Sequence, residues 1–363
     1  MTETVEKLAR VRKYLKAHNL DGVVFLTRAN FAWLSGGGDS HVVSQQELGF
    51  GALVVTAKAA WLVANKIEID RLHTEENLTA FTPKPFPWIQ PMAEALAKLL
   101  PEGVFASDLP GGALTALPGD FVYECRAQLS EHEIRRYKAL GRDCALVLET
   151  VARQLQIGDS EHQAEGDMAR HLLARSIQPY VLLVAYDDRI KRYRHPTPTA
   201  NHLRKMAMLV ICGQRGGLIA CLTRLIHFGA LPQELANRHE ACLRVEAAFW
   251  AATKVGATYG DIYQTGCDAY KKEGFPKEWE LHHQGGPCGY AGRDLLAVPN
   301  EPHLVLDKQA VAWNPSITGT KSEDTFIMDG TQRLVLTATS PDWPTSKVSA
   351  LGESFVRPLI LVR

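Results

Sequence analysis

The sequence predicts a chain of two domains. An α/β domain is expected at residues 1–125, and an α+β domain with a curved antiparallel sheet at residues 126–363. The 363 residues are too many for one small core. Helix and strand patterns alternate over the first part of the chain, and a long amphipathic segment then follows a stretch rich in glycine and proline. Strand patterns dominate the end of the chain.

The first domain is expected to begin with an amphipathic helix over residues 4–18. Its apolar side chains recur at helical spacing on an otherwise charged segment: Val5, Leu8, Val11 and Leu15. After a turn at residues 19–22, the β-branched run GVVFLT (22–27) predicts a buried strand. Residues 50–64 predict two more strands around a short connection.

A long helix is expected to open the second domain, after the glycine- and proline-rich segment 109–120. Ser130 and Glu133 form a capping-box pattern at its start. A second helix is expected over 159–177, with Asp159 or Ser160 as its N-cap. The following segments predict a strand, a hairpin and two helices, in this order: 180–186, 208–213 with 218–226, 232–254 and 260–273.

Composition excludes several classes of protein. Forty Lys and Arg balance forty Asp and Glu, so nothing favours nucleic acid or an anionic membrane as a partner. No apolar run reaches ~18 residues, so no membrane span is predicted, and the N-terminus lacks a signal-peptide core. Seven scattered cysteines without CxxC spacing indicate reduced thiols, and we expect a cytoplasmic protein.

The order of the motifs resembles the superfamily of creatinase, prolidase and aminopeptidase P, the M24 peptidases. Seven segments carry the resemblance: LDGVVFLTRANFAWLSGG (20–37), LSEHEIRRYKALGRDCA (129–145), GDSEHQ (158–163), RHPTPT (194–199), the hairpin at 211–224, KVGATYGDIY (254–263) and KSEDTFIMDG (321–330). The resemblance implies a pita-bread fold for the second domain, a homodimer, and a small molecule or short peptide as substrate.

The peptidases of this family hold two divalent ions with two Asp, one His and two Glu. Counting back from Thr223-Arg224, the two Asp positions here hold Ile211 and Cys221. The later motifs QGGPCGY, WNPSI and SEDT place Gly286 at the His position and Asn314 and Glu323 at the two Glu positions. Ile and Gly offer no side-chain ligand, Cys is a soft ligand, and one carboxylate does not hold two dications against water. We therefore expect no bound metal and no other cofactor.

His195 is the strongest catalytic candidate, since the resemblance places a His before the hairpin beside the scissile group. A neutral-range pKa suits it to acid–base work, as in metal-free creatinase; the alternative is a His that caps a loop. Glu323 either grips a cationic substrate group or is a buried carboxylate paired with Lys321 or Arg224. Both residues are predicted to be catalytic.

The loop ELHHQGGPCGYAGRD (280–294) adds three candidates. His283 is predicted to be catalytic. Arg293 either binds a substrate carboxylate or is a solvated residue of a structural turn. Cys288 either contacts substrate as a nucleophile or packs inertly.

Three further residues are expected to contact substrate. Asp187 lies in the charged segment 186–196, which is otherwise a solvated loop. Asn314 lies at a former ligand position, and Trp313 adjoins that position or alternatively belongs to the core.

Three functions stay open. We favour a metal-independent, creatinase-like hydrolase of a small C–N substrate (amide, amidine or peptide-like). The second possibility is a catalytically silent binding protein with the same fold. The third is an Xaa-Pro dipeptidase-like metallopeptidase with displaced ligands. Activity that survives chelators distinguishes the first from the third, and binding without turnover identifies the second.

Overall fold

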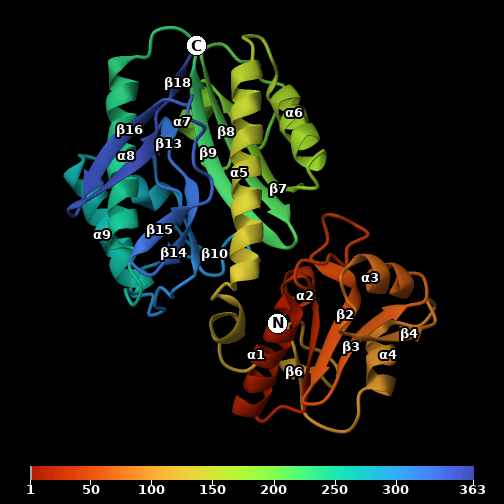
Figure 1. Cartoon of the computed structure of the whole chain (residues 1–363). Coiled ribbons are helices and arrows are strands. Elements are labelled where there is room, and N and C mark those ends of the chain that lie inside the picture. Colours follow the sequence, from red (N-terminus) through yellow and green to blue (C-terminus); the bar gives the residue numbers. More distant parts are fainter. Residues whose placement is uncertain (1) are drawn as a thin grey trace. The chain divides into compact units, whose positions relative to one another are not determined.

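The computed structural model describes residues 2–363, which divide into two compact units. The first unit comprises the chain up to Glu133 together with Gly216–Leu218, and the second comprises Ile134–Arg215 and Ile219–Arg363 (Figure 1). Among residues 2–363, no helix is long and apolar enough to cross a bilayer.

A six-stranded sheet organises the first unit, with strand order β4-β3-β2-β1-β5-β6. The elements follow the chain as α1 (Glu3–Ala17), β1 (Gly22–Thr27), α2 (Arg28–Ser35), β2 (Leu48–Thr56), β3 (Ala60–Asn65), α3 (Ile69–Glu75), β4 (Thr82–Phe86), α4 (Met92–Leu99), β5 (Phe105–Ser107) and β6 (Thr115–Ala116). The predicted helix, the strand at 22–27 and the two strands within 50–64 are confirmed.

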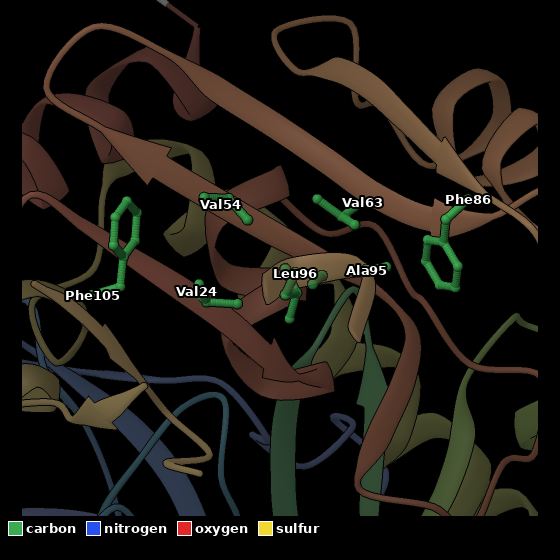
Figure 2. Packing of buried hydrophobic residues seen from close by; sticks show 8 residues of the cluster. Val24, Val54, Val63, Phe86, Ala95, Leu96 and Phe105 are labelled. Atoms are coloured by element: carbon green, nitrogen blue, oxygen red, sulfur yellow. The ribbon is translucent and has the colours of Figure 1, made fainter. Parts of the chain in front are cut away.

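Helix α4 packs on this sheet and buries its apolar face there. Figure 2 shows Ala95 and Leu96 of α4 against Val24, Val54 and Val63 of the strands. Burying one such aliphatic side chain is worth about 1.5–3 kcal/mol, so this layer contributes strongly to the stability of the unit.

The buried face of α1 differs from the predicted one. Leu8, Val11 and Leu15 are buried as expected, but Val5 is 45% exposed. The buried Lys7 lies on the inner face instead, where it pairs with Glu3 and Glu133. Three ion-paired groups thus replace an apolar contact that the spacing alone predicted.

Two four-stranded sheets form the centre of the second unit, with strand orders β18-β9-β8-β7 and β10-β11-β14-β15. In Figure 1, α5 and α6 lie on one side of these strands, and α8 and α9 on the other. The elements are α5 (Glu131–Gln154), α6 (Glu161–Leu173), β7 (Gln178–Tyr186), α7 (Asp188–Arg192), β8 (Met206–Arg215), β9 (Leu218–His227), α8 (Gln233–Ala252), α9 (Tyr259–Lys272), β10 (Gly285–Cys288), β11 (Ala310–Trp313), β12 (Ser316–Ile317), β13 (Thr320–Lys321), β14 (Asp324–Asp329), β15 (Gln332–Val335), β16 (Thr345–Ala350), β17 (Glu353–Pro358) and β18 (Leu361–Val362).

The local signals of this unit are largely confirmed. The amide of Ser130 donates to the Glu133 carboxylate at 2.7 Å and the amide of Glu133 to Ser130 Oγ at 3.3 Å, which completes the capping box. Ser160, not Asp159, is the N-cap of α6. The charged segment expected as a loop contains the short helix α7.

Candidate functional site

The centre of the site is the buried carboxylate of Glu323, which lies directly before β14. Arg293 Nη2 is 3.1 Å from its Oε1 and Lys321 Nζ is 2.9 Å from its Oε2. Thr223 on β9 also donates its hydroxyl to Oε2 at 2.9 Å. Burial alone would raise the pKa of Glu323, but the charges of Lys321 and Arg293 outweigh it and lower that pKa to about 2. The carboxylate is therefore ionised and already paired with two cations.

Two thiols lie beside this ion-pair network. Arg293 Nη1 is 3.5 Å from Cys221 Sγ on β9, and Cys221 pairs with Cys212 on β8. The hydrogen bond from Cys212, together with the charge of Arg293, lowers the pKa of Cys221 below its ordinary value. The same pairing and burial raise the pKa of Cys212.

The structure corrects the expected position of the first metal ligand. The sequence predicts Ile211 at this position, but the side chain that faces Cys221 is Cys212. A Cβ built on the next residue, Gly213, would lie 2.5 Å from Cys144 Sγ of α5 and 3.6 Å from Ile211. Successive side chains of a strand point to opposite faces, so Ile211 and Gly213 face α5 and Cys212 faces the site.

The position of the expected histidine ligand has no room for a side chain. Gly286 on β10 has φ +152°, and a Cβ there would lie 2.6 Å from the carbonyl oxygen of Leu295. Asn314, at the next ligand position, is buried, and its Oδ1 has no hydrogen-bond partner among residues 2–363.

The dinuclear centre that the fold implies does not fit these residues. The five ligand positions hold two thiols, a glycine, an amide and one carboxylate, and that carboxylate is paired with Arg293 and Lys321. Both cations repel a dication, and Mg²⁺-like or Mn²⁺-like ions prefer carboxylates.

Three histidines form a second cluster. His195 follows α7, and His282 and His283 lie in the short segment between Leu281 and β10. The Nε2 atoms of His195 and His282 are 3.0 Å apart, and the ring centroids of His282 and His283 are 4.5 Å apart. His282 is buried, whereas His195 is exposed.

All three imidazoles are neutral at physiological pH. Burial and the charge of Lys321 lower the pKa of His282 to about 2, and burial and the charge of Arg293 lower that of His283 to about 4. Partial desolvation and Lys321 lower the pKa of His195 below 6.5. A neutral His195 accepts a proton, as a general base must.

Two expected substrate-binding residues have other roles. Trp313 is fully buried, stacks on Phe249 with ring centroids 4.6 Å apart and donates its indole N–H to Thr253. Asp187 accepts hydrogen bonds from the amides of residues 204–206 and lines a separate cavity of about 610 Å³. Trp313 therefore belongs to the core, and Asp187 fixes the backbone that leads into β8.

Cys288 is also buried. Its Sγ is 3.6 Å from Tyr137 Oη, and burial raises the pKa of the thiol to about 12. A thiol is a poor nucleophile and the thiolate is the reactive form, so this pKa argues against nucleophilic chemistry at Cys288.

Sequence reasoning missed two residues of the site. The sequence predicts Lys321 only as a partner of a buried Glu323, although its position two residues before Glu323 was the signal that it belongs to the site. The sequence analysis names His283 and not His282, although the adjacent pair of histidines at 282–283 was the signal for both.

Comparison with known proteins agrees with the fold and the motif order. The model of metallopeptidase family M24 matches residues 135–322, and that of the creatinase/prolidase N-terminal domain matches residues 7–140. The chain belongs to metallopeptidase family M24, and its second unit has the pita-bread fold.

Solved structures show the same architecture. The prolidase of Pyrococcus horikoshii OT3 is 16% identical, with a TM-score of 0.78 over 93% of this chain and 99% of that chain. An Xaa-Pro dipeptidase of Bacillus anthracis is 14% identical, with a TM-score of 0.76 over 99% and 100%. The N-terminal domain of the FACT complex subunit SPT16 of Cicer arietinum is 12% identical, with a TM-score of 0.69 over 93% and 96%. No curated protein sequence matches the chain.

Proposed function

We propose that this protein is a hydrolase of a small amide, amidine or short peptide that works without the dinuclear centre of its family. The observation that carries the proposal is the state of Glu323: the one carboxylate left at the ligand positions is buried and paired with Arg293 and Lys321. We further propose a cytoplasmic homodimer, as the resemblance implies.

In this proposal His195 is the acid–base residue. The Nε2 atoms of His195 and His282 are 3.0 Å apart. In the tautomer that this proposal assigns, Nε2 of His195 donates to Nε2 of His282, which leaves the lone pair of Nδ1 of His195 free. Nδ1 removes the proton of the attacking water and later gives it to the leaving nitrogen. The hydrogen bond to His282 orients the ring throughout, so His282 is a positioning residue.

Charge in the site indicates which end of the substrate binds there. Arg293 and Lys321 share the carboxylate of Glu323, which leaves one net positive charge. This charge favours a substrate with an anionic group and stabilises negative charge that develops on the attacked carbonyl oxygen.

The test is turnover by chelated protein. The full-length chain, dialysed against EDTA, is assayed with Xaa-Pro dipeptides, small amides and amidines. We expect activity that survives EDTA, is lost in His195→Ala, and persists in His162→Ala, which changes an exposed histidine of α6. Activity that disappears with EDTA and returns with Mn²⁺ or Co²⁺ would refute metal independence.

A binding protein without turnover is the second candidate. Arg293, Lys321 and Glu323 satisfy one another without a substrate, as expected of a silent site. Saturable binding of a carboxylate ligand without product would support this candidate.

A further inference from the structure

We propose that His195, His282 and His283 form a binding site for one transition-metal dication. This site uses none of the five positions where the family holds its ions, and it does not depend on the proposed hydrolysis.

The geometry of the three rings supports a shared ion. One ring nitrogen from each histidine lies within 4.8 Å of the others. With zinc–nitrogen bonds of about 2.0–2.1 Å, a tetrahedral ion holds its donors about 3.3 Å apart. The Nε2 atoms of His195 and His282 are already 3.0 Å apart. Small rotations of His283 therefore complete a three-nitrogen set.

An unmade bond in the cluster points the same way. The Nδ1 atom of His283 is buried and has no hydrogen-bond partner among residues 2–363. A buried polar nitrogen without a partner costs about 1–3 kcal/mol. An ion, or a water bound to it, gives such a nitrogen a partner.

The donor chemistry selects the class of ion. Imidazole suits Zn²⁺, Cu²⁺ and Ni²⁺, whereas Mg²⁺ and Ca²⁺ prefer oxygen ligands. The net positive charge of the group formed by Arg293, Lys321 and Glu323 weakens dication binding, so this site favours the metals with the strongest affinity for imidazole.

Solvent reaches the cluster through His195, which is exposed. An ion can enter from that side, and water can complete its coordination. Because the ion fixes the ring that the proposed hydrolysis needs as a base, Zn²⁺ binding is expected to inhibit hydrolysis.

The experiment measures binding directly. The full-length chain is stripped with dipicolinate, and Co²⁺ is titrated while its visible absorption is followed. Zn²⁺ affinity is then measured by competition with a chromogenic chelator. We expect one ion per chain and Zn²⁺ displacing Co²⁺. Loss of a group that merely orients a ligand costs about 10–100-fold in affinity, so His195→Ala and His283→Ala should each lose at least tenfold.

Controls separate this site from surface histidines and from folding defects. His162→Ala should bind like the unchanged protein, and circular dichroism checks that every variant is folded. His195 is exposed, so its replacement should leave the fold intact even if His283→Ala does not fold. Absence of saturable binding, or unchanged Zn²⁺ affinity in His195→Ala, would overturn the proposal. Metal that activates turnover would support the site but refute the metal-free hydrolase.

Discussion

Replacing Glu323 by glutamine tests the electrostatic reading of the site. The change keeps the shape of the side chain but leaves Arg293 and Lys321 without their shared counter-ion. A carboxyl pKa lowered from 4.5 to about 2 corresponds to about 3 kcal/mol of stability. Removing one partner of a buried ion pair costs a similar amount, about 3–5 kcal/mol. We expect Glu323→Gln to be about 3 kcal/mol less stable at pH 7.

The stability contribution of Glu323 should depend on pH in a definite direction. Because the pKa of Glu323 is lower in the folded than in the unfolded chain, its contribution is fully present above about pH 4.5 and is lost as the pH falls towards 2. The difference between Glu323→Gln and the unchanged protein should therefore shrink over that window.

Urea unfolding followed by circular dichroism, from pH 7 down to pH 3, measures both effects. The matched control is Glu280→Gln, which changes an exposed carboxylate and should alter stability by less than about 0.5 kcal/mol. Equal stability of Glu323→Gln and the unchanged protein at pH 7, or a difference that stays constant down to pH 3, would refute the reasoning.

Three further predictions concern the backbone, the core and the acid–base residue. Gly330→Ala should lower stability by roughly 1 kcal/mol, and Gly286→Ala by more, because only Gly286→Ala forces a Cβ against a carbonyl oxygen. Thermal unfolding of the two variants tests this difference. Trp313→Phe should lose about 1–3 kcal/mol by removing the indole bond to Thr253, while KM stays unchanged; a raised KM in a stable variant would return Trp313 to the substrate site. The acid limb of the kcat/KM profile should fall below pH 6.5, where the lowered pKa of His195 lies; a midpoint above pH 7 would contradict that role.

Local sequence signals were enough to predict most of the helices and strands. Capping residues, β-branched runs and helical spacing depend on neighbours in the sequence, and α5, β1 and the hairpin of β8 and β9 followed from them. The residue that faces the site on β8 did not follow, because a shift of one residue exchanges Ile211 for Cys212 on that face. Motif counting fixes a position only to within such a shift.

The chemistry of the site depends on contacts between distant segments. Tertiary packing brings both Arg293 and Lys321 to Glu323. It also brings His195 to His282, which is 87 residues away in the sequence. Asp187 and Trp313 were predicted as site residues because they adjoin motifs. In the structure Asp187 instead binds backbone amides of the segment before β8, and Trp313 packs in the core.

The backbone at Gly286 limits how this protein can be redesigned. Its positive φ and the nearby Leu295 carbonyl exclude a histidine there, and the amide of Ala297 holds the carbonyl of Gly285 at 2.9 Å, which ties the same loop down. Introducing the missing metal ligands one by one therefore cannot rebuild a dinuclear peptidase on this chain. An engineer would first have to replace the loop between β10 and β11, so the difference from the metal enzymes lies in the main chain as well as in the side chains.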